Sequence, residues 1–153
     1  MIRNTAVTVC GPLNVNKLGV TYVHEHLMVK PQLPDEYYIP YTLDDEAAST
    51  EETRSFSAAG GETLVEMTPI NYGRNVKAYQ RIAQATGVHV ICCTGFHKQL
   101  FMPPWFGDKT DGELYDILMD EVTNGLDGTE IHPGVIKLGT SFEEVTAAEK
   151  RSI

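Results

Sequence analysis

Two histidines stand one residue apart in an apolar, β-branched stretch near the start of the chain. The stretch reads VTYVHEHLMV and contains His24 and His26. On a β-strand, residues two positions apart point to the same face, so we expect the two imidazoles to converge on one point. Neutral imidazole is a good ligand for a divalent ion such as Zn²⁺. A metal site is one interpretation; two strand-end histidines that hydrogen-bond to the backbone are the other.

A lysine in an apolar run favours the metal interpretation. Lys137 lies within GVIKLGT at 134–140, where a buried ammonium group is costly without a partner. Burial lowers the pKa of a lysine and makes its amine reactive. Such an amine can take up carbon dioxide to form a carbamate, an anionic ligand able to bridge two metals. The alternative is a lysine that extends its ammonium group to solvent.

Four further side chains are candidates for the same site. Glu66, in apolar company, is either a partner for a metal-bound imidazole or an ordinary buried acid. Arg74, near a helix start, is either a substrate-binding residue for an anionic group or a surface arginine. His97 follows a predicted strand, where substrate-binding loops are expected. Trp105, with neighbouring phenylalanines, either lines an apolar substrate pocket or covers the core.

The elements that position these residues alternate between strand-like and helix-like segments. Strands are expected at 19–27, 62–68, 88–94 and 134–140, after a hairpin at 5–15; helices are expected from Asp44 or Asp45 to 60, at 75–86, at 111–125 and from Thr146. Such repeats predict right-handed parallel crossovers and an α/β sheet. Four units make half of a (βα)₈ TIM barrel, which takes about 250 residues; an open parallel sheet is the alternative. Long loops after the first and third strands favour the barrel.

His89 and His132 precede strands and are not expected in the site.

Composition limits the classes of function. The 153 residues suffice for one domain over 1–153, and a net charge of −9 without a basic cluster argues against nucleic-acid or anionic-membrane partners. We see neither a signal-peptide pattern nor an apolar segment long enough to span a bilayer. Three cysteines without zinc-type spacing indicate reduced thiols, so we expect a cytoplasmic protein.

Several motifs in order along the chain carry a family resemblance: TVCGP at 8–12, LGVT at 18–21 leading into HEHL at 24–27, AGGETLVE at 59–66, YGRN at 72–75, CTGF at 93–96, GLDGT at 125–129 and GVIKLGTS at 134–141. Together they resemble the N-terminal half of a phosphotriesterase-family member of the amidohydrolase superfamily. The resemblance covers essentially the whole chain.

The resemblance implies a (βα)₈ barrel with two divalent metal ions, expected to be zinc, at its C-terminal face. It implies that His24 and His26 bind one metal, and that Lys137, as a catalytic carbamate, bridges both. The centre would activate water for attack on a phosphotriester or a lactone, and a lactone or other ester is the expected substrate. His97 departs from the family, where a larger aromatic residue is frequent. The remaining family ligands, two histidines and an aspartate, come from strands five, six and eight, which the 153 residues do not include.

The missing ligands lead to an expectation about the isolated chain. We expect it to be weakly active or inactive, and to associate with itself or with a complementary C-terminal half, because a half-barrel exposes two sheet edges. Two other functions stay open. One is a non-catalytic fragment or half-barrel partner; the other is a module in which His24 and His26 hold one metal and Lys137 remains an ordinary amine.

Overall fold

The sheet at the centre of the molecule is parallel and follows the chain order. A computed structural model describes residues 4–31 and 42–153, so most of the predicted connection from Lys30 to Leu43 lies outside the described residues. The strands are β3 (Thr21–Glu25), β4 (Thr63–Glu66), β5 (His89–Gly95) and β6 (Val135–Lys137), in the order β3-β4-β5-β6. The predicted strand–helix repeat and its parallel pairing are confirmed.

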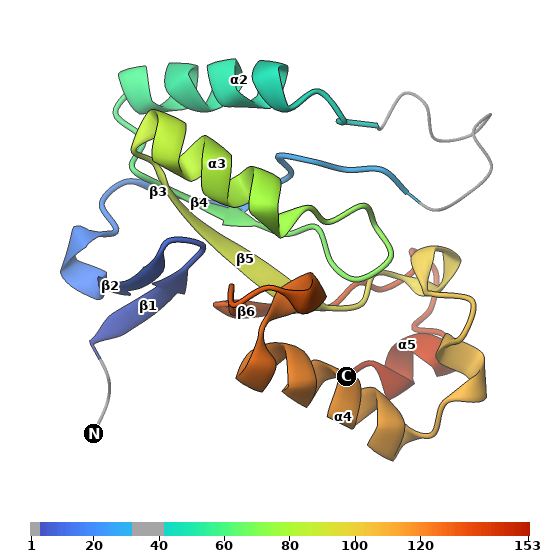
Figure 1. The fold of residues 1–153 in the computed structure, drawn as a ribbon. Helices are drawn as coiled ribbons and strands as arrows, with labels where there is room; N and C mark the ends of the chain where they lie inside the picture. The colour runs from blue at the N-terminus through green and yellow to red at the C-terminus, as the bar shows by residue number, and fades with distance from the viewer. Residues whose placement is uncertain (1–3, 32–41) are drawn as a thin grey trace.

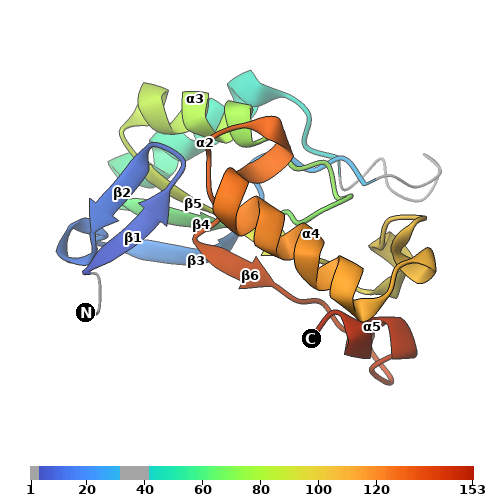
Figure 2. The same cartoon turned by 60° about the horizontal axis from the view of Figure 1, so that its bottom comes forward.

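The N-terminal hairpin closes one end of this sheet. Strands β1 (Thr5–Thr8) and β2 (Gly11–Asn14) pair antiparallel, as expected from the sequence. The backbone N–H of Val9 donates to the carbonyl of Val90 on β5 at 2.8 Å, which fixes the hairpin to the sheet. Figure 2 shows the hairpin at the end where β3 begins and α5 at the opposite end, beyond β6. The C-terminal ends of the strands are therefore left for loops and for the candidate site.

Each helix begins at the cap that the sequence predicts to within a residue or two. The helices are α2 (Glu46–Ala58), α3 (Val76–Thr86), α4 (Asp111–Asn124) and α5 (Ala147–Arg151). Asp45 and Asn75 accept backbone N–H groups at the starts of α2 and α3, while Thr110 and Thr146 form capping boxes for α4 and α5. These side chains satisfy N–H groups that have no partner within the helix.

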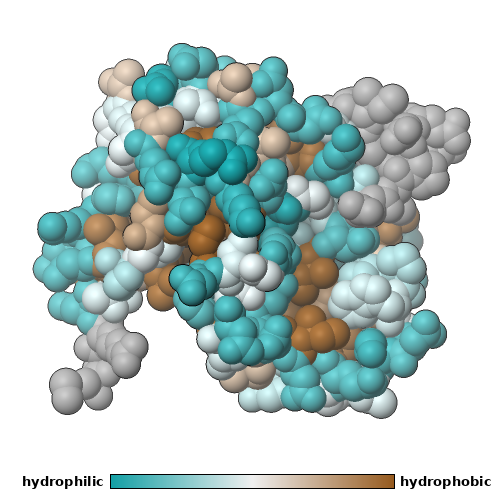
Figure 3. All heavy atoms as spheres, viewed as in Figure 1, coloured by the Kyte–Doolittle hydropathy of each residue, from teal (hydrophilic) through white to brown (hydrophobic). Residues whose placement is uncertain are grey.

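The helices lie around the curved sheet, so that in one view (Figure 1) they stand on both sides of the strands. Figure 1 shows α2 and α3 side by side above the strands and α4 below them. The main core packs the apolar face of α3 against β4 and β5, through Tyr79, Ile82, Leu64, Val90 and Cys92, all at most 3% exposed. On the molecular surface seen in Figure 3, hydrophobic side chains form separate patches between hydrophilic ones. Among the described residues, no helix combines the length and apolar character that crossing a membrane requires.

Two details differ from the sequence-based expectations. The fourth strand is three residues long rather than the seven of 134–140, and the chain leaves the sheet directly after Lys137. The sequence also predicts an apolar stripe on α4, formed by Leu114, Ile117, Leu118 and Val122; of these only Leu114 is buried, and Val122 is 42% exposed. Helix α4 lies beside β6, a sheet edge, so part of its stripe has nothing in the described chain to pack against. The fold is thus half of a (βα)₈ barrel with an N-terminal hairpin.

Candidate metal centre

The curvature of the sheet brings together residues from its two opposite edges. His24 is on β3 and Lys137 is the last residue of β6, yet His24 Nε2 lies 3.5 Å from Lys137 Nζ. The rings of His24 and His26 have centroids 5.3 Å apart and meet edge to face. Lys137 is only 9% exposed, so it does not extend its ammonium group to solvent. A flat four-stranded sheet would keep its edge strands well over 10 Å apart.

The electrostatics of the cluster favour neutral nitrogen atoms. Burial lowers the pKa of Lys137 and lowers the pKa of His26 to about 4, with the neighbouring His24 and Lys137 adding to the effect on His26. The pKa of His24 is lowered by burial and by Lys137. Unprotonated imidazole nitrogens carry the lone pairs that a divalent cation binds, and the lowered pKa of Lys137 makes its neutral amine easier to form, so the donor set fits a metal.

The cluster supplies only part of a metal coordination sphere. Within residues 4–31 and 42–153, no group of three or more histidine, cysteine, aspartate or glutamate side chains is placed to hold an ion. Two imidazoles and one lysine therefore account for the ligands that the described chain offers. A catalytic zinc ion needs three protein ligands and an open position.

A buried carboxylate supports the ring of His26. Nδ1 of His26 lies 2.8 Å from the hydroxyl of Thr68, and that hydroxyl lies 2.5 Å from Glu66 Oε1. Glu66 is fully buried, and burial raises its pKa to about 7 although hydrogen bonds from Thr68 and Leu27 oppose the shift. Of the two interpretations of Glu66, the structure supports a partner for an imidazole, acting through Thr68.

His97 lies next to the histidine pair, separated by one aromatic ring. Tyr72 lies between them, with its ring 6.0 Å from His26 and 4.8 Å from His97. Phe101 stacks on His97 at 4.8 Å. The backbone N–H of Lys98 donates to His97 Nδ1 at 2.8 Å, so a neutral His97 carries its proton on Nε2. Burial, together with the charge of Lys137, lowers the pKa of His97 to about 4.

Arg74 and Trp105 lie apart from this cluster. The guanidinium of Arg74 is 4% exposed and pairs with Glu121 at 2.5 Å and Asp127 at 2.6 Å. Burial opposes its charge, but these acids hold its pKa above the usual value. Because its donors are taken up by these acids and by the carbonyl of Cys93, Arg74 ties α4 to the sheet.

Trp105 instead contacts a second apolar cluster, which does not include the histidines. Its ring contacts Phe96 at 6.2 Å, and Phe96 packs with Phe106 and Leu114 beneath α4. Trp105 is 36% exposed and makes no described ring contact with any of the three histidines. Of the predicted aromatic residues, it is Phe101 that stands beside His97.

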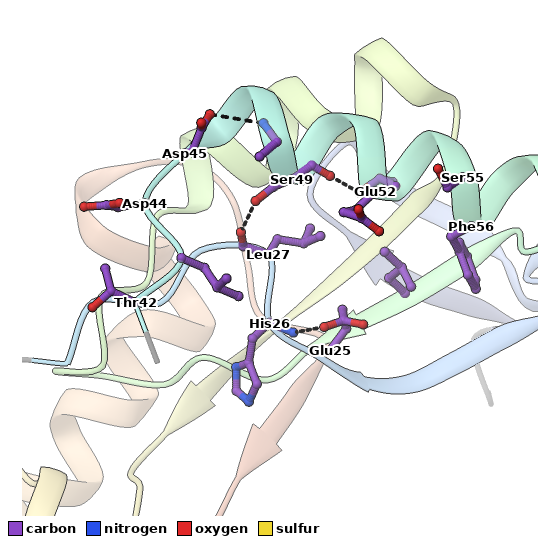
Figure 4. Close-up of a pocket in the computed structure, with 14 residues that line it drawn as sticks. Glu25, His26, Leu27, Thr42, Asp44, Asp45, Ser49, Glu52, Ser55 and Phe56 are labelled. Atoms are coloured by element: carbon purple, nitrogen blue, oxygen red, sulfur yellow. Dashed lines mark hydrogen bonds between the residues drawn. The ribbon is translucent and has the colours of Figure 1, made fainter. Parts of the chain in front are cut away.

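A cavity of about 540 Å³ lies on the other side of β3, beneath α2. Its lining includes Glu25, Leu27, Ser49 and Phe56 (Figure 4). The imidazole of His26 points away from α2, whereas Glu25 lies on the cavity side (Figure 4). The strand expected at 19–27 ends at Glu25 and its register is irregular between Tyr22 and Glu25, so His26 lies just beyond β3; the rings of His24 and His26 nevertheless lie next to each other. His26 also lines this cavity, but its imidazole points away from α2, so the cavity borders the candidate metal centre from the other side of the chain at His26.

Two neighbours of the site, Thr68 and Tyr72, were not predicted from the sequence. Thr68 stands two positions after Glu66, so the period of a strand already placed both side chains on one face. That spacing is the signal that could have found it. Tyr72 lies in a turn after β4, and no periodicity describes such a segment.

The sequence profile of the phosphotriesterase family matches residues 4–153. The chain belongs to the phosphotriesterase family. A phosphotriesterase-related protein of Nematostella vectensis is 32% identical over 100% of this chain and 53% of its own length. A phospho-furanose lactonase of Mycoplasmopsis synoviae is 30% identical over 100% of this chain and 48% of its own.

Solved structures of the phosphotriesterase family share the fold as well. A lactonase of Listeria monocytogenes superimposes with a TM-score of 0.86 and 28% identity, over 97% of this chain and 51% of the other. The described sheet is thus the first half of such a barrel. The chain spans about half the length of the curated relatives it matches.

Proposed function

We propose that this chain forms the N-terminal half of a metal-dependent hydrolase that acts on a small-molecule ester or lactone. The observation that carries the proposal is the convergence of His24, His26 and Lys137 from the two edges of one curved sheet. Family membership adds support, since relatives include proteins named as lactonases. In this proposal the other half of the barrel supplies the remaining ligands that the family resemblance implies.

In this proposal each residue of the cluster has its own role. His24 and His26 offer imidazole nitrogens to a divalent cation, for which zinc is the candidate. Lys137 offers a largely buried amine, which as a carbamate would supply oxygen ligands in place of nitrogen. A cation held there would activate water and polarise the bond under attack.

The rings beside the cluster would bind the substrate. Tyr72 and Phe101 present apolar faces, and His97 presents an N–H at Nε2 when it is neutral. Such a donor suits the carbonyl or phosphoryl oxygen of an ester, because charge builds up on that oxygen in the transition state. This assignment replaces Arg74 and Trp105 with Tyr72 and Phe101.

The proposal includes a partner for the open half-barrel. Within the described residues, the outer sides of β3 and β6 are unpaired. Exposed apolar side chains accompany them, namely Val20, Tyr22, Val23, Ile136 and Leu138. Either a complementary C-terminal half or a second copy of the chain would cover this surface, and only the former would bring the family's remaining ligands. We also propose that the protein works in the cytoplasm, as its free cysteines suggest.

Zinc uptake by the purified 153-residue chain tests the metal centre. Equilibrium dialysis at micromolar zinc, with and without bicarbonate, is compared for the wild type, His24→Asn and Lys137→Ala. We expect weak uptake that bicarbonate strengthens, and a loss of affinity of more than about tenfold in both variants. The half-buried His132→Asn and the exposed Lys77→Ala, both outside the cluster, are the controls and should bind as the wild type does.

Two results would contradict the proposal. Uptake that survives His24→Asn would place the metal elsewhere. Uptake that depends on His24 but not on Lys137 or bicarbonate would identify the single-metal module instead. If the proposal holds, addition of a separately produced C-terminal half should raise both the zinc content and the rate of lactone hydrolysis.

A further inference from the structure

A short line of hydrogen bonds joins the interior of the sheet to His26. Glu66 is the last residue of β4, Thr68 follows two positions later, and both are 0% exposed. The hydroxyl of Thr68 lies between Glu66 Oε1, at 2.5 Å, and His26 Nδ1, at 2.8 Å. Of His24 and His26, it is His26 that has this support from the segment around the end of β4 in the described part of the chain.

The direction of these hydrogen bonds follows from the surroundings of Glu66. Its Oε1 accepts the backbone N–H of Leu27 and its Oε2 accepts that of Thr68, each at 3.2 Å. These donors, together with the 2.5 Å contact, are typical of an ionised carboxylate that accepts a hydroxyl proton. A hydroxyl has a single proton, so Thr68 gives it to Glu66 and its oxygen accepts a hydrogen from His26.

We propose that Thr68 and Glu66 are positioning residues that hold His26 with its proton on Nδ1, leaving the Nε2 lone pair for a metal ion. This inference rests on the proposed function for its purpose, although the geometry stands without a metal. Hydrogen bonds from outside the coordination sphere generally fix the ring orientation of histidine ligands in this way. His97 has the opposite arrangement, because its Nδ1 accepts from Lys98.

Nitrogen NMR of the metal-free 153-residue protein tests the arrangement directly. At pH 8.5, where the imidazoles are neutral and Glu66 is ionised, His26 should show a protonated Nδ1 and an unprotonated Nε2. Thr68→Ser should preserve this pattern, because it keeps the hydroxyl. Thr68→Val should shift His26 toward the form protonated on Nε2, and should weaken zinc binding about 10- to 100-fold.

Two further variants make the test specific. Thr94→Val is the matched control, because Thr94 is also fully buried and donates to a carboxylate, that of Glu121, but touches no histidine. It should leave His26 unchanged. Glu66→Gln can donate an amide hydrogen to Thr68 and so release the hydroxyl proton toward His26. Glu66→Gln should therefore increase the form of His26 that is protonated on Nε2. It is the alternative test if Thr68→Val does not fold.

Either of two NMR results would overturn the inference. A His26 protonated on Nε2 in the wild type would do so, as would an unchanged pattern in both Thr68→Val and Glu66→Gln. If the wild type shows the expected pattern and Thr68→Val removes it, but neither protein binds zinc, the positioning role stands. The proposed metal function would then fail on its own.

Discussion

The buried carboxylate of Glu149 shows how a single residue ties the C-terminal segment to the site-bearing loops. It is 0% exposed and accepts hydrogen bonds from Ser141 Oγ at 2.6 Å and from the backbone N–H groups of Gln99, Thr146 and Ser141. Burial raises the cost of ionisation, but these donors outweigh it and lower the pKa of Glu149 to about 2.

This pKa predicts a specific loss of stability in acid. The native pKa lies below the value of about 4.3 for an unfolded glutamate, so ionised Glu149 stabilises the fold above that pH. The contribution is lost as the pH falls from about 5 toward 2. We expect Glu149→Gln to lower the free energy of unfolding at pH 7 and to converge with the wild type near pH 2, measured by urea unfolding. The exposed Glu144→Gln is the control; a difference independent of pH would contradict the assignment.

The sequence predicted the ligand residues better than their neighbours. Strand period predicted that His24 and His26 converge, and apolar context singled out Lys137, but only the family resemblance implied that the lysine joins the histidines. The partner of Arg74 was not predictable, since Glu121 and Asp127 lie about 50 positions away and reach it only through packing. The loops that position Tyr72 and Phe101 have no periodicity from which to infer contacts.

At the scale of secondary structure, the junction between β5 and β6 depends on a glycine. Gly95 ends β5 with a φ of 108°, and a Cβ there would collide with the carbonyl oxygen of Lys137. That carbonyl also accepts the backbone N–H of Phe96 at 3.2 Å. The two strands can therefore approach closely enough to place Lys137 in the cluster only because residue 95 lacks a side chain.

Gly95→Ala should accordingly be more costly than an alanine at a comparable glycine. Gly60 has a φ of 94° but open space around its missing Cβ, so Gly60→Ala should cost about 1 kcal/mol from conformation alone. Gly95→Ala adds the collision with Lys137 and should cost roughly 2 kcal/mol or more. Urea unfolding of the two variants measures the difference. Equal losses would show that the strands separate without penalty.

For the molecule as a whole, we expect the two sheet edges that are unpaired within residues 4–31 and 42–153 to decide how it behaves in solution. Helix caps and strand period predicted the bounds of the helices and strands to within a few residues. However, β6 is shorter than expected, and little of the apolar side of α4 is buried. Both deviations lie at the side where the barrel would continue. Val23, 69% exposed, and Ile136, 63% exposed, mark the two edges. Apolar side chains beside unpaired backbone groups favour association with another strand.

We therefore expect the isolated chain to self-associate in a concentration-dependent manner in sedimentation velocity. Combining Val23→Lys with Ile136→Lys should shift it toward monomer, because charged side chains on edge strands oppose pairing, while far-UV circular dichroism stays unchanged. Tyr115→Lys, equally exposed on α4, is the control and should not alter association. A wild-type monomer at every concentration would refute the role of the edges. A mixed complex with a C-terminal half, formed in preference to the homo-oligomer, would show that the same edges select the complementary half of the barrel.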